Sequence, residues 1–212
     1  VRFLESNGPA TELVISHIRH ATQGELSLAN TQPFVRELGG RRHVFAHNGN
    51  LPGIYRSAAL ALDRYRPVGQ TDSEHAFCAL LSRLSPLWPA QSPPTLDARL
   101  SVLSEFAHEL RALGPANFLY ADGDALFAHG HRRMQTTGRA EPPGLWTRQR
   151  LCSPADAAPE HAGGASITQA GQTVVWVASV PLTQDAWQPL ADGELVAVRA
   201  GALLARRLAT AA

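Results

Sequence analysis

Apolar residues follow strand spacing near the start of the chain, helical spacing in the middle and strand spacing again towards the end. A short β-branched run at 13–18 and a short apolar run at 44–46 predict strands. The first run leads into a polar loop that contains glycine, and the second ends at His47, Asn48 and Gly49. Both predicted strands therefore end at clusters of polar side chains.

Two consecutive helices are predicted in the middle of the chain. Apolar residues recur every three or four positions from 72 to 84 and from 96 to 113, which is the spacing of one helical face. Thr71 or Asp72 can cap the start of the first helix, and Gly114 can stop the second. A proline-rich turn separates the two helices.

The second half of the chain has the pattern of antiparallel strands. Residues 117–121 and 125–128 flank Asp122-Gly123-Asp124, which is a good hairpin signal. Residues 172–180 and 194–199 predict two more strands. Strands, then two helices, then more strands indicate an α+β fold rather than a parallel sheet with crossover helices.

Length and composition indicate one compact domain over residues 1–212. The chain is 44% hydrophobic and 17% charged, which is enough apolar material for a sizeable core. Its net charge is +1 and its arginines are scattered, so no nucleic acid is expected as a partner. The longest apolar runs have strand length, far below the roughly 20 residues of a membrane helix, so no membrane segment is expected. Residues 139–164 are rich in Pro, Gly and Ala and are predicted to be loop.

Cys78 and Cys152 are the only cysteines in the sequence, too few for a disulfide framework. Together with a start that does not resemble a signal peptide, they favour a reducing, cytoplasmic environment. Residue 1 is Val rather than Met, and the first residues resemble the end of a strand already under way. We therefore expect that one or more N-terminal strands are missing from this chain.

Three clusters combine turn glycines with polar groups at the ends of predicted elements, where a rigid scaffold can hold a site. They are His17-Ile-Arg19-His-Ala-Thr22-Gln-Gly24 with Asn30-Thr-Gln-Pro33-Phe34, His47-Asn48-Gly49-Asn50-Leu51, and Gln70-Thr71-Asp72-Ser73-Glu74. Each has a simpler structural explanation when it is taken alone. Arg19 can form a surface or interdomain ion pair, Asn48-Gly49 a hairpin turn, and Asp72 a helix cap.

The nine histidines permit a metal hypothesis as well. His129 and His131, with His17 or His20, can be drawn as a zinc site. The sequence has no Cys pair and no helical His-x-x-x-His pattern, which are the usual supports for such a site. No metal and no other cofactor is therefore expected.

In this order and with these separations, the three clusters resemble the core of the class II glutamine amidotransferases, which are N-terminal-nucleophile hydrolases. The resemblance is closest to the stand-alone YafJ-like group, which includes the γ-glutamyl hydrolase of ergothioneine synthesis. Further segments share it: Arg36-Glu37-Leu38, Arg66-Pro67-Val68-Gly69, Pro181-Leu182-Thr183 with Trp187, and Gly193-Glu194. The resemblance therefore covers most of the chain and is weakest between 139 and 166.

The resemblance implies a fold and a set of roles. The fold would be a four-layer αββα sandwich, with two antiparallel sheets between helical layers. Arg19 would hold the α-carboxylate of the substrate, helped by Thr22, and Asp72 would hold its α-ammonium. The Asn48 side chain and the Gly49 N–H would form an oxyanion hole. The implied reaction is hydrolysis of a γ-glutamyl amide, either glutamine or a γ-glutamyl conjugate, with a separate ammonia-acceptor protein or none.

These roles require three residues that are distant in the sequence to lie close together in the fold. Arg19, Asn48 and Asp72 must converge on one pocket, although more than fifty residues separate the first from the last. We therefore expect the strands that end at Arg19 and at His47 to be neighbours in one sheet.

The chain departs from the family at the nucleophile. The family uses a cysteine at the mature N-terminus, and the α-amine of that cysteine serves as the base. Cys78 lies in a predicted helix and Cys152 in a proline-rich loop, so neither is a substitute. Gln23 stands where relatives that pass ammonia to a synthase often carry His. The chain as it stands is expected to be inactive, and the alternative is a degenerate domain that binds an amino acid or a partner without turnover.

Overall fold

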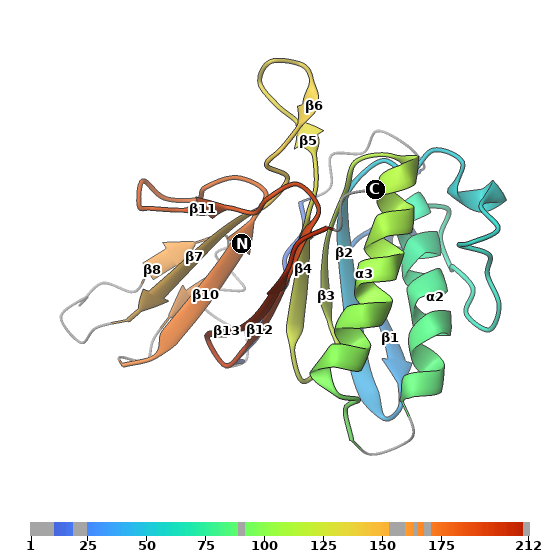
Figure 1. The fold of residues 1–212 in the computed structure, drawn as a ribbon, viewed down its shortest axis with the longest axis horizontal. Helices are drawn as coiled ribbons and strands as arrows, with labels where there is room; N and C mark the ends of the chain where they lie inside the picture. Colours follow the sequence, from blue (N-terminus) through green and yellow to red (C-terminus); the bar gives the residue numbers. More distant parts are fainter. Residues whose placement is uncertain are drawn as a thin grey trace.

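The computed structural model of the chain contains two α-helices and two main β-sheets in the residues that it describes (Figure 1). These residues are 11–18, 25–88, 92–152, 160–162, 165–167 and 171–209. Both helices cover one face of the larger sheet, and the smaller sheet lies on its other face (Figure 1). No helix in this part of the chain has the length and apolarity needed to cross a membrane.

The larger sheet has six antiparallel strands in the order β1-β2-β3-β4-β12-β13. They are β1 (Phe34–Leu38), β2 (Arg41–Gly49), β3 (Ala116–Ala121), β4 (Leu126–Gly130), β12 (Glu194–Arg199) and β13 (Ala202–Arg207). The smaller sheet, in the order β10-β7-β11, contains β7 (Trp146–Leu151), β10 (Thr173–Ala178) and β11 (Gln188–Pro189). Two short hairpins pair β5 (Arg133–Met134) with β6 (Ala140–Glu141), and β8 (Glu160–Ala162) with β9 (Ala165–Ile167). Antiparallel sheets combined with a helical pair agree with the predicted α+β class.

Helices α2 (Asp72–Leu84) and α3 (Leu96–Leu113) have the bounds that the sequence predicts. The Thr71 hydroxyl accepts the Glu74 N–H at 3.2 Å and caps α2, and a threonine caps α3 in the same way. The cap of α2 is therefore Thr71, which leaves the Asp72 carboxylate for other contacts. Within the described ranges, three short 3₁₀ helices lie in the connections: η1 (Leu28–Asn30), η2 (Ile54–Arg56) and η3 (Ser85–Leu87).

The main hydrophobic core lies between the helices and the larger sheet. Phe45 of β2 stacks on Phe77 of α2 with ring centroids 5.3 Å apart, and Phe106 of α3 contacts Phe118 of β3 edge-on at 5.7 Å. All four rings are at most 1% exposed. Burial of such a side chain contributes about 1.5–3 kcal/mol, so these contacts fix β2 and β3 beneath the two helices.

The opposite face of the larger sheet packs against the smaller sheet. Val175 and Val177 of β10 lie against Leu126 of β4 and Val198 of β12. The described residues therefore show three layers: the helices, the larger sheet and the smaller sheet (Figure 1). A second helical layer, which the four-layer sandwich requires, stays a prediction.

The N-terminal strand prediction is wrong for this structure. Residues 13–18 are not assigned to a strand and have no ladder partner in the described part of the chain, and Leu13, Val14 and Ile18 are exposed. The neighbours of β2 are β1 and β3, so the expectation that the strand at 13–18 lies beside it is wrong as well. A strand requires a partner for its backbone groups, and a β-branched run does not specify where that partner comes from.

The long segment predicted as loop contains a strand. Within residues 139–164, β7 pairs with β10 over six residue pairs and forms the centre of the smaller sheet. Its sequence, Trp-Thr-Arg-Gln-Arg-Leu, has few apolar positions and therefore no clear strand signal. The sequence also gives no prediction of β1 and β13, which form the two edges of the larger sheet. Edge strands are half exposed and carry a weak apolar pattern.

Candidate active site

The structure describes three of the five residues that the resemblance assigns to substrate contacts. Arg19 and Thr22 lie outside the described residues. Asp72 starts α2, and Asn48 and Gly49 end β2. The Asp72 carboxylate accepts the N–H of Leu51 at 2.8 Å. This bond joins the start of α2 to the segment that follows Asn48 and Gly49, so the structure brings these two predicted clusters together.

Asn48 and Gly49 belong to a strand, so the hairpin-turn interpretation of this pair is wrong. β2 continues through both residues, with Asn48 opposite Asn117 and Gly49 opposite Ala116. A Cβ at position 49 would lie 1.8 Å from the carbonyl oxygen of Pro115. Glycine is required here because the neighbouring backbone approaches too closely for any side chain.

The Gly49 N–H points away from β3. The N–H of His47 bonds to the Gln32 side chain at 2.6 Å, whereas the N–H of Asn50 bonds to the carbonyl of Pro115 at 3.1 Å, on the β3 side. Backbone groups two residues apart in a strand point to the same side, so the Gly49 N–H shares the side of His47. Asn48 and Gly49 are both exposed, which makes them available as hydrogen-bond donors to a bound oxygen.

A buried asparagine holds the backbone of this strand end. Asn117 is fully buried, and its amide donates to the carbonyl of Asn48 at 2.8 Å and to that of Arg132 at 2.7 Å. Its side-chain oxygen accepts the N–H of His131 at 2.7 Å. A Cβ on Gly144 would lie 1.6 Å from that oxygen. Asn117 of β3 therefore fixes the backbone of Asn48. The sequence pattern does not indicate this role.

The Asp72 carboxylate is held by backbone donors. One oxygen accepts the Leu51 N–H at 2.8 Å, and the other accepts the Ser73 N–H at 2.7 Å. Its place in the first turn of α2 also sets a negative charge at the positive end of the helix dipole. The oxygen that accepts the Leu51 N–H has no other hydrogen bond in the described part of the chain, and a carboxylate oxygen can accept a second one, so Asp72 keeps the capacity to bind an ammonium group.

Hydrogen bonds between side chains connect the end of β2 to the start of α2. Ser73 Oγ lies 2.9 Å from His47 Nδ1 and donates to the Asp72 carboxylate at 3.2 Å. Ser73 therefore bridges the His47 ring and the Asp72 carboxylate, and the other ring nitrogen of His47 is Nε2. That Nε2 is buried without a hydrogen-bond partner in the described part of the chain. Burial lowers the pKa of His47 to about 4, although the Asp72 carboxylate acts in the opposite direction. His47 is therefore neutral near pH 7.

A second carboxylate organises the loop beside the site. Glu74 is 1% exposed, pairs with Arg36 and accepts the N–H groups of Val68 at 2.9 Å and Gly69 at 2.7 Å. Asn30 accepts the following N–H along the chain at 2.8 Å. Two of the segments that share the family resemblance, those with Arg36 and with Val68 and Gly69, therefore meet at one buried side chain. Glu74 supports the site and is not placed to contact a substrate.

Neither cysteine of the chain has the environment of a nucleophile. Cys78 is fully buried in α2, and burial raises the pKa of its thiol to about 11. Cys152 is also buried, and both are free thiols. A reactive cysteine requires an accessible thiolate, so neither residue is suited to attack an amide.

His129, one of the histidines considered above as a metal ligand, packs in the protein interior. His129 is fully buried against Phe118, with ring centroids 5.1 Å apart. Burial, helped by the charge of Arg111, lowers the pKa of His129 to about 3. Among the described residues, no group of three or more His, Cys, Asp or Glu side chains is arranged to hold a metal ion. His20 lies outside these residues.

Comparisons with known proteins agree with these features. Residues 1–211 match the family model of class II glutamine amidotransferases. The putative glutamine amidotransferase YafJ of Escherichia coli is 38% identical over 182 residues, which cover 85% of this chain and 67% of YafJ. A predicted glutamine amidotransferase from Pseudomonas aeruginosa has a crystal structure that matches with a TM-score of 0.63 and 34% identity. That match covers 84% of this chain and 66% of the Pseudomonas protein.

A more distant structure agrees in fold alone. The glutamine phosphoribosylpyrophosphate amidotransferase of B. subtilis matches with a TM-score of 0.51 and 15% identity, over 92% of this chain and 34% of that protein. The chain spans about two thirds of the length of YafJ and of the Pseudomonas protein. The family model matches nearly the whole chain, and the chain therefore belongs to the class II glutamine amidotransferases.

Proposed function

We propose that this chain supplies the substrate-binding and oxyanion-stabilising groups of an enzyme that hydrolyses a γ-glutamyl amide, either glutamine or a γ-glutamyl conjugate. The observation that carries the proposal is the 2.8 Å bond between the Asp72 carboxylate and the Leu51 N–H. This bond joins Asp72 to the segment that follows Asn48 and Gly49, and in this proposal the Asp72 carboxylate would bind the α-ammonium beside that strand end. A γ-glutamyl group has an α-ammonium at one end and the reacting carbonyl at the other, which matches this pair of features.

In this proposal Arg19, helped by Thr22, binds the α-carboxylate of the substrate. A guanidinium can bind both oxygens of the α-carboxylate. The placement is supported by His17, two residues before Arg19, because its charge is one of the causes that lower the pKa of the buried His47. His17 therefore lies within electrostatic range of His47, near the end of β2.

The nucleophile in the proposed mechanism is the thiolate of an N-terminal cysteine outside these 212 residues, with its own α-amine as the base. The surroundings of Cys78 and Cys152 support an external nucleophile. The sulfur would attack the γ-carbonyl carbon, and the oxygen would become an oxyanion held by Asn48 and Gly49. Collapse would expel ammonia or an amine, which takes a proton from the α-ammonium of the cysteine. Water would then release glutamate from the thioester and restore the thiol.

The complete enzyme in this proposal has the four-layer αββα sandwich, with the missing N-terminal strands supplied by the same segment that carries the cysteine. In this proposal the 212 residues belong to one amidotransferase domain. Released ammonia is either passed to a separate acceptor protein or lost. A cytoplasmic location, as the two free thiols suggest, completes the proposal.

One experiment tests the proposal directly. The codons upstream of Val1 are read for an in-frame Met-Cys, and the chain is produced with and without that extension, with its first residue established by mass spectrometry. The extended chain should release glutamate from glutamine or a γ-glutamyl conjugate, and the 212-residue chain should not. Turnover by a chain that begins at Val1 would overturn the proposed nucleophile. An extended chain that binds glutamine without turnover would support the alternative, a degenerate binding domain.

Replacement of Arg19 by Lys should raise KM for the γ-glutamyl substrate by about tenfold or more and change kcat far less. Lysine keeps the charge but loses the forked contact that is already made in the ground state. Steady-state kinetics of the extended chain give both parameters. A fall in kcat at unchanged KM would argue against a role in binding the carboxylate.

A further inference from the structure

A pocket of about 220 Å³ lies between α3, the start of β12 and the end of β13. Its lining shares no residue with the candidate active site. Arg111, His108 and Ser104 line it from α3, Arg207 from β13, and Gly193 from the turn before β12. Ser104, His108 and Arg111 are spaced by four and three residues, so they lie on one face of the helix.

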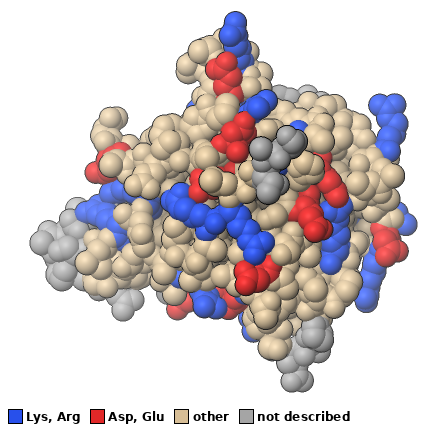
Figure 2. Space-filling model, in the orientation of Figure 1, with Lys and Arg blue, Asp and Glu red and all other residues tan. Residues whose placement is uncertain are grey.

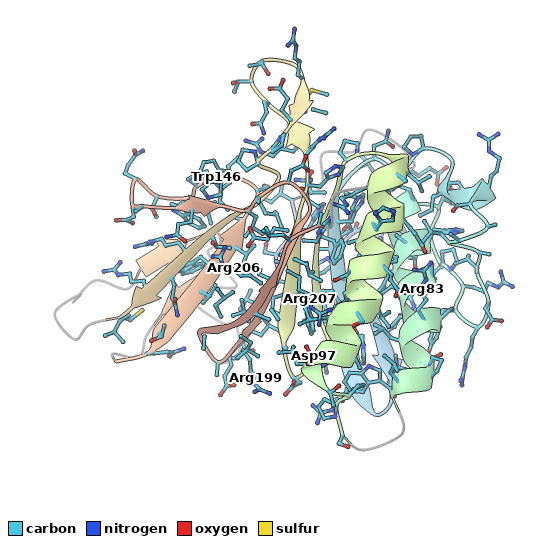
Figure 3. All side chains as sticks on the ribbon, viewed as in Figure 1. Arg83, Asp97, Trp146, Arg199, Arg206 and Arg207 are labelled. Carbon is cyan, nitrogen blue, oxygen red and sulfur yellow. The ribbon has the colours of Figure 1, made fainter. Side chains whose placement is uncertain are left out.

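The lining is basic and contains no carboxylate. Arg111 forms no ion pair in the described part of the chain. Arg207 is anchored at one side by Asp97, at 3.0 Å, and Asp97 is 90% exposed (Figure 3). The nearby Glu194 is already bonded to Arg206 at 2.8 Å. Basic side chains gather on this face, over β12 and β13 (Figure 2).

Two buried polar atoms of the lining have no hydrogen-bond partner among the described residues. They are Arg111 Nε and Ser104 Oγ. Arg111 Nη2 has only a long contact of 3.5 Å to His108 Nδ1. Both atoms lie beneath the pocket surface, so a ligand would meet Arg111 through its Nη groups. The guanidinium has no acceptor at short distance among the described residues, and a polyoxygen anion in the pocket can supply one.

The Arg111 side chain is held in place by Gly193. A Cβ at position 193 would lie 1.8 Å from Arg111 Nη1, and the backbone of Gly193 has a φ of +80°, which favours glycine. The guanidinium therefore lies against the Gly193 backbone, at the boundary of the pocket. This contact orders a long side chain before any ligand binds, which reduces the entropy cost of binding.

We propose that this pocket binds a phosphate group. The Nη groups of the Arg111 guanidinium can donate to two phosphate oxygens, and Arg207 adds positive charge. A volume of 220 Å³ corresponds to about seven waters at about 30 Å³ each. The pocket therefore has room for phosphate and for a small organic substituent attached to it.

The test measures the binding of inorganic phosphate to the full chain by calorimetry at constant ionic strength, with sulfate, acetate and chloride for comparison. Phosphate should bind with a Kd of about 1 mM or tighter, and acetate and chloride at least about tenfold more weakly. A phosphate monoester, run in parallel, shows whether a substituent improves binding over free phosphate. If all anions at equal ionic strength act alike, the effect is ionic screening and the proposal is overturned.

Variants locate the binding site. Arg111→Gln should weaken phosphate binding about tenfold or more, and Arg111→Lys, which keeps the charge but loses the fork, should weaken it less. The matched control is Arg56→Gln, which removes one exposed positive charge in η2, away from the pocket lining. Thermal melting confirms that each variant is folded. Unchanged affinity in folded Arg111→Gln, or an equal loss in Arg56→Gln, would overturn the proposal. Neither result bears on amide hydrolysis, because the assay needs no turnover.

Discussion

Replacement of Gly49 by Ala should lower the free energy of unfolding by about 3 kcal/mol. The added Cβ would meet the Pro115 carbonyl oxygen at 1.8 Å and His47 Nε2 at 2.8 Å. The first of these is a backbone atom next to β3, so it cannot rotate away as a flexible side chain can. Relief of the overlap requires β2 and β3 to separate at the candidate oxyanion hole.

Urea unfolding of the chain measures this effect. The matched control is Gly53→Ala, because Gly53 has a φ of +82° but open space around the position of a Cβ. That control carries the backbone strain of a left-handed residue, about 1–2 kcal/mol, and no steric overlap. If Gly49→Ala costs no more than Gly53→Ala, the close approach of the two strands is not what demands glycine at position 49.

Replacement of Asn48 by Ala should lower kcat of the extended chain by about 10²–10³ and leave KM nearly unchanged. The oxyanion exists only on the way through the tetrahedral state, so its donors act on kcat rather than on ground-state binding. The substitution leaves the strand in place, because Asn117 holds position 48 through the backbone carbonyl. The lost rate can then be attributed to the side-chain amide.

The matched control for this prediction is Asn50→Ala. Asn50 is a second exposed asparagine two residues further along, and it has no assigned role at the oxyanion. Its replacement should change kcat by no more than a few fold. A loss in Asn48→Ala that falls equally on KM and kcat, or an equal loss in both variants, would contradict an oxyanion role for the Asn48 amide.

Local signals in the sequence predicted the helices and one hairpin. The spacing of apolar residues gave both helices with the bounds that the structure shows, and Thr71 caps the first of them. The segment Asp122-Gly123-Asp124 joins β3 to β4 as the turn signal indicates. These features depend on residues within a few positions of each other, so the sequence alone determines them.

Tertiary structure decided which segments become strands and how far they extend. β2 runs past His47 to Gly49 because β3 offers partners for these residues, and β7 forms despite its polar sequence because β10 pairs with it. Residues 13–18 have a strand pattern and no ladder partner among the described residues. Sheet pairing joins segments that are distant along the chain, and no local pattern specifies it.

The sequence likewise indicated one part of the candidate site, and the fold showed the other part. The sequence singled out Asn48, Gly49 and Asp72 through their motifs, because those residue types at those positions resemble a known family. Only the fold showed that Ser73 links His47 to Asp72 and that Asn117 holds the backbone of Asn48. These supporting side chains act through burial and hydrogen bonds across more than twenty residues of sequence, and such contacts come into existence only when the chain has folded.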